Sequence, residues 1–154
     1  MSVYDTDLTV GVAMLLADHG HGTWDPEGVY QPGETGIVLD LVPQTPDDVI
    51  TLSAYGVDDD VTEGRSVVGV QIRNRATAGD NPRPARELAA AIFTTLHGRT
   101  QITLATGLRV HQINRASWTS GGQDSNRRWS MIQNFYADIY IPAKQLYPPG
   151  GMTP

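Results

Sequence analysis

Hydrophobic positions along the chain follow two periods, which together predict two helices and six strands. Helical spacing of apolar residues runs through residues 5–18, and again from the helix-start signal Asp80-Asn81-Pro82 to about Leu96. Alternating or short apolar runs predict strands at 37–42, 49–55, 66–75, 101–104, 108–116 and 129–141. The polar, Gly-rich or Pro-rich stretches between them, such as 21–36, 58–64 and 120–126, are expected to be loops.

This order of elements predicts an α+β domain. We expect a mixed, largely antiparallel sheet of about five to six strands, with the two helices packed on one face. The domain should span residues 1–142. Residues 143–154 are rich in Pro and Gly and cannot continue a sheet, so we expect an extended C-terminal arm. An adjacent subunit is the natural partner for that arm, through Leu146 and Tyr147.

Composition supports a folded domain without adding chemistry. The 154 residues are 40% hydrophobic and 18% charged, as in globular proteins, and include no cysteine for disulfides or thiolate metal sites. The N-terminus lacks the basic and apolar regions of a signal peptide, and no apolar run approaches the ~20 residues that span a bilayer. We therefore expect a protein made and used without secretion.

Charge is divided unevenly along the chain. The first 64 residues hold thirteen of the seventeen acidic residues and no Lys or Arg, whereas all eleven Lys and Arg lie from Arg65 onward. One interpretation is that the fold has two oppositely charged surfaces, which would orient contacts between copies or with unlike neighbours. The other is that both parts intermix and the charges cancel. The net charge of −6 disfavours non-specific nucleic-acid binding by the whole molecule.

The sequence predicts no metal or cofactor site. His19 and His21 are two residues apart but have no third ligand nearby. The acidic run 58–63 lacks the Gly at position 6 and the Glu at position 12 of an EF-hand loop. We interpret it as a solvated acidic loop.

No motif for an enzyme is present either. The chain lacks a Gly-x-Ser-x-Gly elbow, a phosphate-binding Gly-x-x-x-x-Gly-Lys loop and a Gly-x-Gly-x-x-Gly fingerprint. Two arginine pairs, Arg73 with Arg75 and Arg127 with Arg128, could contact phosphates beside Trp129 or could contact protein. We favour protein contacts and expect no enzymatic activity.

Several strings, in this order and spacing, resemble a known family. They are HGTWDP (21–26), ETGIVL (34–39), YGVDDD (55–60), SVVGVQIR (66–73), LHG (96–98) and RWSMIQNFYADI (128–139). The chain resembles the minor capsid or tail terminator proteins of long-tailed bacteriophages, from about Asp5 to Pro142. The resemblance implies a structural virion protein that forms a ring, typically a hexamer, at the head-proximal end of the tail tube.

Such a ring stops tube polymerisation and offers a docking surface to the head-side connector. The resemblance thus implies three partners: further copies of the chain, the tail tube protein and the connector or stopper protein. DNA would pass through the lumen without specific binding, and no cofactor, membrane or catalytic residue is implied. The protein would lie at the head–tail junction of the virion after assembly in the host cytoplasm.

Within this interpretation we assign positions to the charged residues. Asp58, Asp59 and Asp60 are expected at the lumen or on one face of the ring, where they would repel DNA phosphates. Subunit or tube contacts are expected at Arg73, Arg75, Arg127 and Arg128. The alternative function is a cytosolic α+β module that binds a small ligand or peptide near Trp24, Tyr30 and Tyr55. A soluble hydrolase ranks third.

Overall fold

The computed structural model describes residues 4–60, 64–76 and 79–141, which form two helices and one seven-stranded sheet. The elements are α1 (Tyr4–Asp18), β1 (Thr23–Trp24), β2 (Gly36–Leu39), β3 (Val49–Asp60), β4 (Arg65–Arg75), α2 (Arg83–Leu96), β5 (Arg99–Thr103), β6 (Arg109–Gln123) and β7 (Trp129–Tyr140). The α+β prediction is confirmed. The proposed arm at 143–154, with Leu146 and Tyr147, lies outside the described residues.

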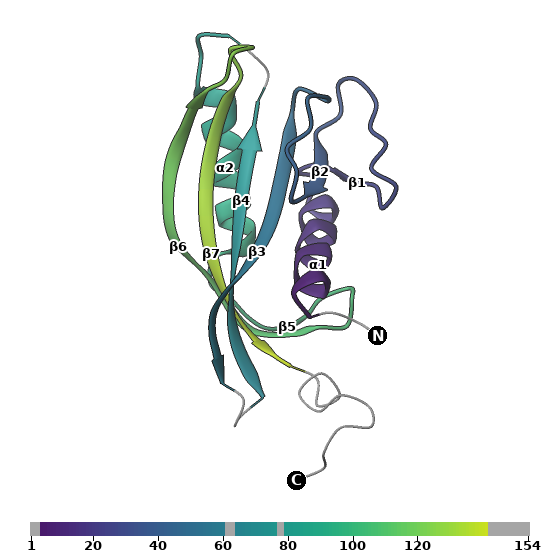
Figure 1. Ribbon diagram of the computed structural model, residues 1–154, viewed down its shortest axis with the longest axis vertical. Coiled ribbons are helices and arrows are strands. Elements are labelled where there is room, and N and C mark those ends of the chain that lie inside the picture. The colour runs from purple at the N-terminus through teal and green to yellow at the C-terminus, as the bar shows by residue number, and fades with distance from the viewer. Residues whose placement is uncertain (1–3, 61–63, 77–78, 142–154) are drawn as a thin grey trace.

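The sheet has the order β1-β2-β3-β4-β7-β6-β5, and its strands curl along their length (Figure 1). The predicted number of five to six strands was too low, because β1 adds a short parallel strand beside β2. β2 and β3 are also parallel, whereas the remaining four neighbouring pairs are antiparallel. The sheet is therefore mixed.

Two strands extend beyond their predicted ends. β3 continues to Asp60, so the run that looked like an acidic loop is the end of a hairpin strand paired with β4. β6 continues to Gln123 through a polar stretch predicted to be a loop, because its backbone pairs with β7 along that length. Backbone pairing with a distant strand, which the local pattern does not report, sustains both extensions.

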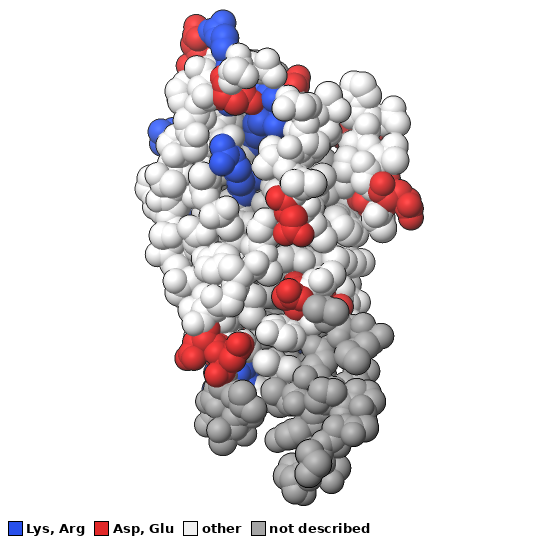
Figure 2. All heavy atoms as spheres, viewed as in Figure 1, with Lys and Arg blue, Asp and Glu red and all other residues white. Residues whose placement is uncertain are grey.

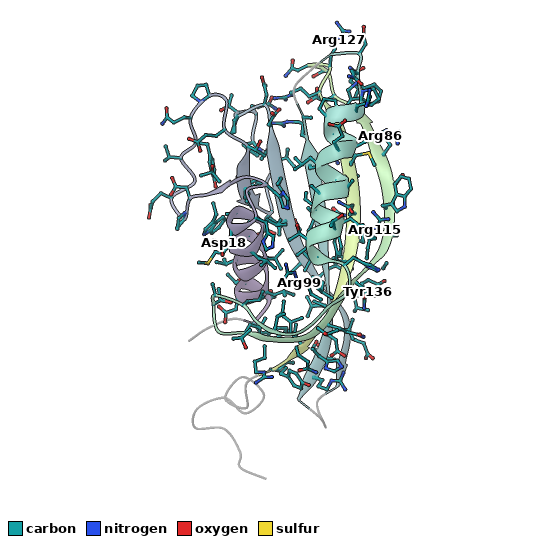
Figure 3. The ribbon with its side chains drawn as sticks, turned by 180° about the vertical axis from the view of Figure 1, so that it is seen from behind. Asp18, Arg86, Arg99, Arg115, Arg127 and Tyr136 are labelled. Carbon is teal, nitrogen blue, oxygen red and sulfur yellow. The ribbon has the colours of Figure 1, made fainter. Side chains whose placement is uncertain are left out.

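Both helices pack on one face of the sheet, as predicted (Figure 3). The core between them is apolar: Leu8, Val12 and Leu16 of α1 and Ile92 and Leu96 of α2 are fully buried. They meet alternate residues of the central strands, including Ile50, Leu52, Val70, Ile72, Phe135 and Ile139. Burial at about 25 cal/mol per Å² of apolar area makes this core the main source of stability.

Two buried amides attach α2 to the sheet. Asn74 of β4 donates to the carbonyl of Ala85 at 2.9 Å, and Gln133 of β7 donates to the carbonyl of Ala89 at 3.0 Å. An unpaired amide in an apolar core costs free energy, so these bonds favour one position of α2 along the strands. The helix is thereby fixed in register as well as held by packing.

The opposite sheet face carries no helix and is largely polar. Asn134 accepts from Gln71 at 3.3 Å and donates to Ser117 at 3.0 Å, which links β4, β7 and β6 side by side. Tyr55 of β3 lies across Gly69 of β4, where an added Cβ would come within 2.2 Å of the ring. Gly69 thus provides the space for this cross-strand contact.

Candidate assembly surfaces

The near-sequential strand order converts the charge division of the sequence into a division in space. α1, β1, β2 and the loops up to Asp48 lie at one side of the sheet, and β6 and α2 lie at the other, while the end strand β5 curls round to pass below α1 (Figure 1). We call the first group the acidic flank; its elements contain nine Asp and Glu and no Lys or Arg. Figure 2 shows acidic side chains over the loops of this flank and basic ones over the upper parts of the central strands.

The charges nevertheless mix locally at the upper end of the sheet. Arg128 forms ion pairs with Asp47 at 3.1 Å and Asp124 at 2.9 Å, and Arg127 pairs with Asp80. Both interpretations of the charge pattern therefore hold in part. Opposite charges pair with one another at the upper end of the sheet, whereas acidic residues without basic ones occupy the acidic flank.

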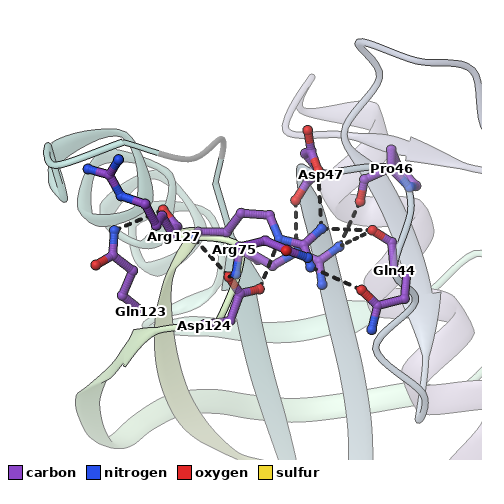
Figure 4. A network of polar contacts seen from close by, with 9 residues as sticks. Gln44, Pro46, Asp47, Arg75, Gln123, Asp124 and Arg127 are labelled. Carbon is purple, nitrogen blue, oxygen red and sulfur yellow. Dashed lines mark hydrogen bonds and ion pairs between the residues drawn. The ribbon is translucent and has the colours of Figure 1, made fainter.

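Arg75 and Arg128 form what we call the arginine clamp, which holds the loop 40–48 against the sheet (Figure 4). The Arg75 Nε donates to the Asp47 carbonyl at 2.8 Å, and its Nη2 donates to the Pro46 carbonyl at 2.7 Å. The Arg128 Nη1 donates to the Gln44 carbonyl at 2.7 Å. The two side chains are only 5% and 4% exposed, so their donors serve the fold of the chain itself.

The clamp also shifts two pKa values. Burial, followed by repulsion from Arg128, lowers the pKa of Arg75. The pKa of Asp124 is lowered chiefly by the hydrogen bond from the backbone N–H of Arg128; burial opposes this, and the Arg128 side chain adds to the lowering.

The other two predicted contact arginines are more accessible. Arg73 is half-buried, and its side chain forms no hydrogen bond or ion pair with any residue that the structure describes. It lines a cleft of about 260 Å³ together with Gln44, Ser130 and the arginine clamp. Arg127 is exposed and projects from the turn at the upper end of the molecule (Figure 3). The structure thus brings Arg73, Arg75 and Arg128 together and leaves Arg127 at the rim.

The acidic residues 58–60 lie at the opposite end of the molecule, on the β3–β4 hairpin. Asp58 and Asp59 are exposed, and Asp59 accepts a hydrogen bond from Ser66 on the facing strand. Asp60 pairs by its backbone with Arg65. The end of β7 lies alongside, since Ile141 donates to the Gly64 carbonyl at 2.7 Å. The candidate acidic and basic residues therefore lie at opposite ends of the long axis.

The residues suggested for a ligand-binding module do not share one pocket. Tyr30 lines a cleft of about 420 Å³ between the loops 30–34 and 45–48, and neither Trp24 nor Tyr55 lines it. Trp24 packs against the hydrophobic core, and Tyr55 lies on the open sheet face over Gly69. Trp129, considered for base stacking, donates to the Gly79 carbonyl at 2.9 Å and packs against α2 residues.

A row of stacked side chains on the other flank was not anticipated from the sequence. The Arg115 guanidinium lies 4.0 Å from the ring centre of Phe93 and 5.7 Å from that of Trp118. The His97 ring also stacks on Phe93, with the ring centres 4.7 Å apart. Trp118 remains 55% exposed. Phe93, Arg115 and Trp118, with the neighbouring Arg86, form what we call the aromatic flank.

A metal centre or a membrane-spanning helix would indicate another function. Among residues 4–60, 64–76 and 79–141, no group of three or more His, Cys, Asp or Glu is placed to hold a metal ion. Neither helix in this described part is long and apolar enough to cross a membrane.

Comparisons with known proteins agree with the resemblance noted from the sequence. The chain is similar over 91% of its length to a chain from the virion of a native gene transfer agent particle, at 18% identity and a TM-score of 0.63, and covers 99% of that chain. At this identity the similarity concerns the fold. None of the curated proteins matches the sequence. Residues 15–141 match the family model described as bacteriophage tail terminator protein, and the chain belongs to that family.

Proposed function

We propose that this protein is the tail terminator of a long-tailed phage. Copies of the chain form a ring, which the resemblance implies to be hexameric, at the head-proximal end of the tail tube. The ring ends tube polymerisation and docks the head-side connector, after assembly in the host cytoplasm. The family match over residues 15–141 carries this proposal. The separation of charge between the two sides of the sheet supports it, because a ring needs two different patches that meet.

Location in the particle tests the function. A label attached to this protein in intact particles is imaged by electron microscopy. A single spot at the head–tail junction is the expected result. Label along the whole tube would instead make it a tube protein, and particles without label would favour the ligand-binding module.

We propose that Asp58, Asp59 and Asp60 face the lumen or one surface of the ring. Asp58 and Asp59 are exposed, and the β3–β4 hairpin that carries them extends beyond the helices at one end of the long axis (Figure 1). Carboxylates there would repel DNA phosphates and keep passage of DNA free of binding. Changing all three to Asn should slow DNA ejection or impair assembly. Unchanged ejection and assembly would remove the proposal.

The proposed contacts of the arginines divide by burial. Arg73 and Arg127 have surface to offer to a neighbouring subunit or to the tube, whereas Arg75 and Arg128 would act by holding the loop 40–48 in shape. Reversing the charge of Arg73 should reduce incorporation into particles with little effect on folding. Normal incorporation of a folded Arg73→Glu variant would count against the contact.

The C-terminal arm is proposed to contact a neighbouring subunit through Leu146 and Tyr147. The last described residue, Ile141, donates to the Gly64 carbonyl beside the acidic hairpin, and residues 143–154 follow soon after it in the sequence. Deleting residues 143–154 should leave the domain folded and reduce ring formation. Full assembly by the deletion variant would contradict this role.

A further inference from the structure

The aromatic flank has the properties of a preformed contact site. Trp118 is 55% exposed, yet Arg115 lies over its ring and over that of Phe93. Arg115 is held in turn, since its backbone N–H donates to His97 at 2.9 Å and its Nη1 donates to the buried Gln133 at 3.0 Å. Ordering a side chain before contact lowers the entropy cost of binding, and Trp and Arg are the residues that most often dominate interfaces.

The strand that carries Trp118 is an unprotected sheet edge. From Asn114 to Gln123, β6 pairs with β7 on one side and with no other strand in the described part of the chain. Residues 116–123 include no charged residue and no proline, the usual means by which an exposed edge avoids association. Two bulges interrupt its register with β7, so side-chain contact is favoured over continuous strand pairing.

Positive charge accompanies this patch. Figure 3 shows Arg86 and Arg115 on the side of α2 that faces β6. Arg86 is exposed, and its side chain has no hydrogen bond or ion pair among the residues that the structure describes. A partner surface would therefore combine apolar area for the indole with carboxylates for the guanidinium groups.

The acidic flank of the same chain offers that combination. The cleft between the loops 30–34 and 45–48 has a volume of about 420 Å³, within the roughly 300–1,000 Å³ of sites that enclose a ligand. Its lining includes the apolar side chains of Tyr30, Pro32 and Pro46 and the carboxylates of Glu34, Asp47 and Asp48. The loops 30–34 and 45–48 that form the cleft lie toward the upper end of the molecule (Figure 1), as does Arg86 (Figure 3). Side-by-side copies can therefore bring them to one level.

We propose that the aromatic flank of one copy docks on the acidic flank of the next, with Trp118 entering the cleft between the loops 30–34 and 45–48 and Arg86 facing its carboxylates. This inference rests on the proposed ring and names the surfaces that would build it. The contact is heterologous, because the two patches lie on different sides of the sheet, and repetition of such a contact can close a ring. The arginine clamp contributes indirectly by fixing the loop 45–48 that forms one wall.

Cross-linking tests the contact directly, because the chain has no cysteine. Thr119→Cys and Pro32→Cys are introduced together; both residues are exposed, one beside Trp118 and one at the cleft. Purified protein and purified particles are then treated with a short bismaleimide. We expect a ladder of covalent oligomers from the double variant and monomers from each single variant. A control pair, Thr119→Cys with Thr103→Cys on β5, should remain monomeric.

Two further variants separate the side chains responsible. Adding Trp118→Ala or Arg86→Glu to the double-cysteine chain should abolish most of the ladder, whereas Arg109→Glu, which alters another exposed arginine, should leave it intact. A ladder in neither purified protein nor particles, or cross-links only to a different protein, would overturn the inference. A ladder from protein that does not lie at the head–tail junction would keep the contact and refute the proposed function instead.

Discussion

Removing the Arg128 side chain of the arginine clamp should destabilise the protein far more than removing the neighbouring, more accessible side chain of Arg73. Arg128→Ala deletes hydrogen bonds to the Asp124 carboxylate at 2.9 Å and to the Gln44 carbonyl at 2.7 Å. Hydrogen bonds that involve a charged group contribute roughly 1.5–3 kcal/mol each. The pair with Asp47, whose side chain is 63% exposed, adds little. Relief of repulsion on Arg75 subtracts from the total.

We therefore expect Arg128→Ala to lower the free energy of unfolding by about 3 kcal/mol. In a domain of this size that corresponds to a fall in Tm of roughly 6–12 °C. Urea unfolding followed by tryptophan fluorescence and circular dichroism measures the change. Arg73→Ala is the matched control and should change the free energy of unfolding by less than about 0.5 kcal/mol, because the Arg73 side chain forms no hydrogen bond or ion pair in the described structure. Equal losses from the two variants would refute the account of the clamp.

Three other perturbations follow from described contacts. Gln133→Leu should cost about 1–3 kcal/mol in urea unfolding, because it removes the donor to the Ala89 carbonyl and the acceptor of the Arg115 guanidinium; no loss would show that these bonds are dispensable. Gly69→Ala should lower the free energy of unfolding by about 1 kcal/mol in the native chain, and by nearly nothing in a chain that already carries Tyr55→Ala. If the two losses are additive in this double-mutant cycle, the cause is not a steric clash between the two residues. Asp124 has a lowered pKa in the folded state, so its stabilisation is present above its unfolded pKa of about 3.9 and is lost as pH falls through the folded pKa. Acid unfolding of Asp124→Asn should accordingly show less dependence on pH in that range, and an unchanged profile would exclude Asp124 as a contributor.

The periodicity of apolar residues predicted helices and strands correctly where one face of the element is buried in the core. The alternation of Val68, Val70 and Ile72 predicted β4, and all three residues are buried in the core. The two residues of β1 are too few to produce any period. The polar end of β6 escaped prediction because hydrogen bonds to β7, a contact distant in sequence, sustain it.

The candidate surfaces were less accessible to sequence reasoning. Charge alone placed Arg75 and Arg128 at intermolecular contacts, but the carbonyls they bind come from a loop some thirty and eighty residues earlier in the chain. The residues next to Arg75 and Arg128 in the sequence do not distinguish a buried arginine from an exposed one. Trp118 was not predicted as a contact residue, because a single aromatic residue in a polar stretch produces no hydrophobic periodicity. Its position in a stretch without charged residues was nevertheless a usable signal.

The arginine clamp also has a mechanical consequence. Through Arg128 it joins the loop between β2 and β3 to Asp124 in the turn between β6 and β7, so it bridges the upper end of the sheet from one side to the other. A force that pulls adjacent strands apart at that end must break several charged hydrogen bonds at once, whereas strands joined only by their ladders can open one bond at a time. At the other end, the ion pair of Arg65 with Asp138 joins only the neighbouring strands β4 and β7. Under load the molecule should therefore yield first at the acidic hairpin and last at the clamped end.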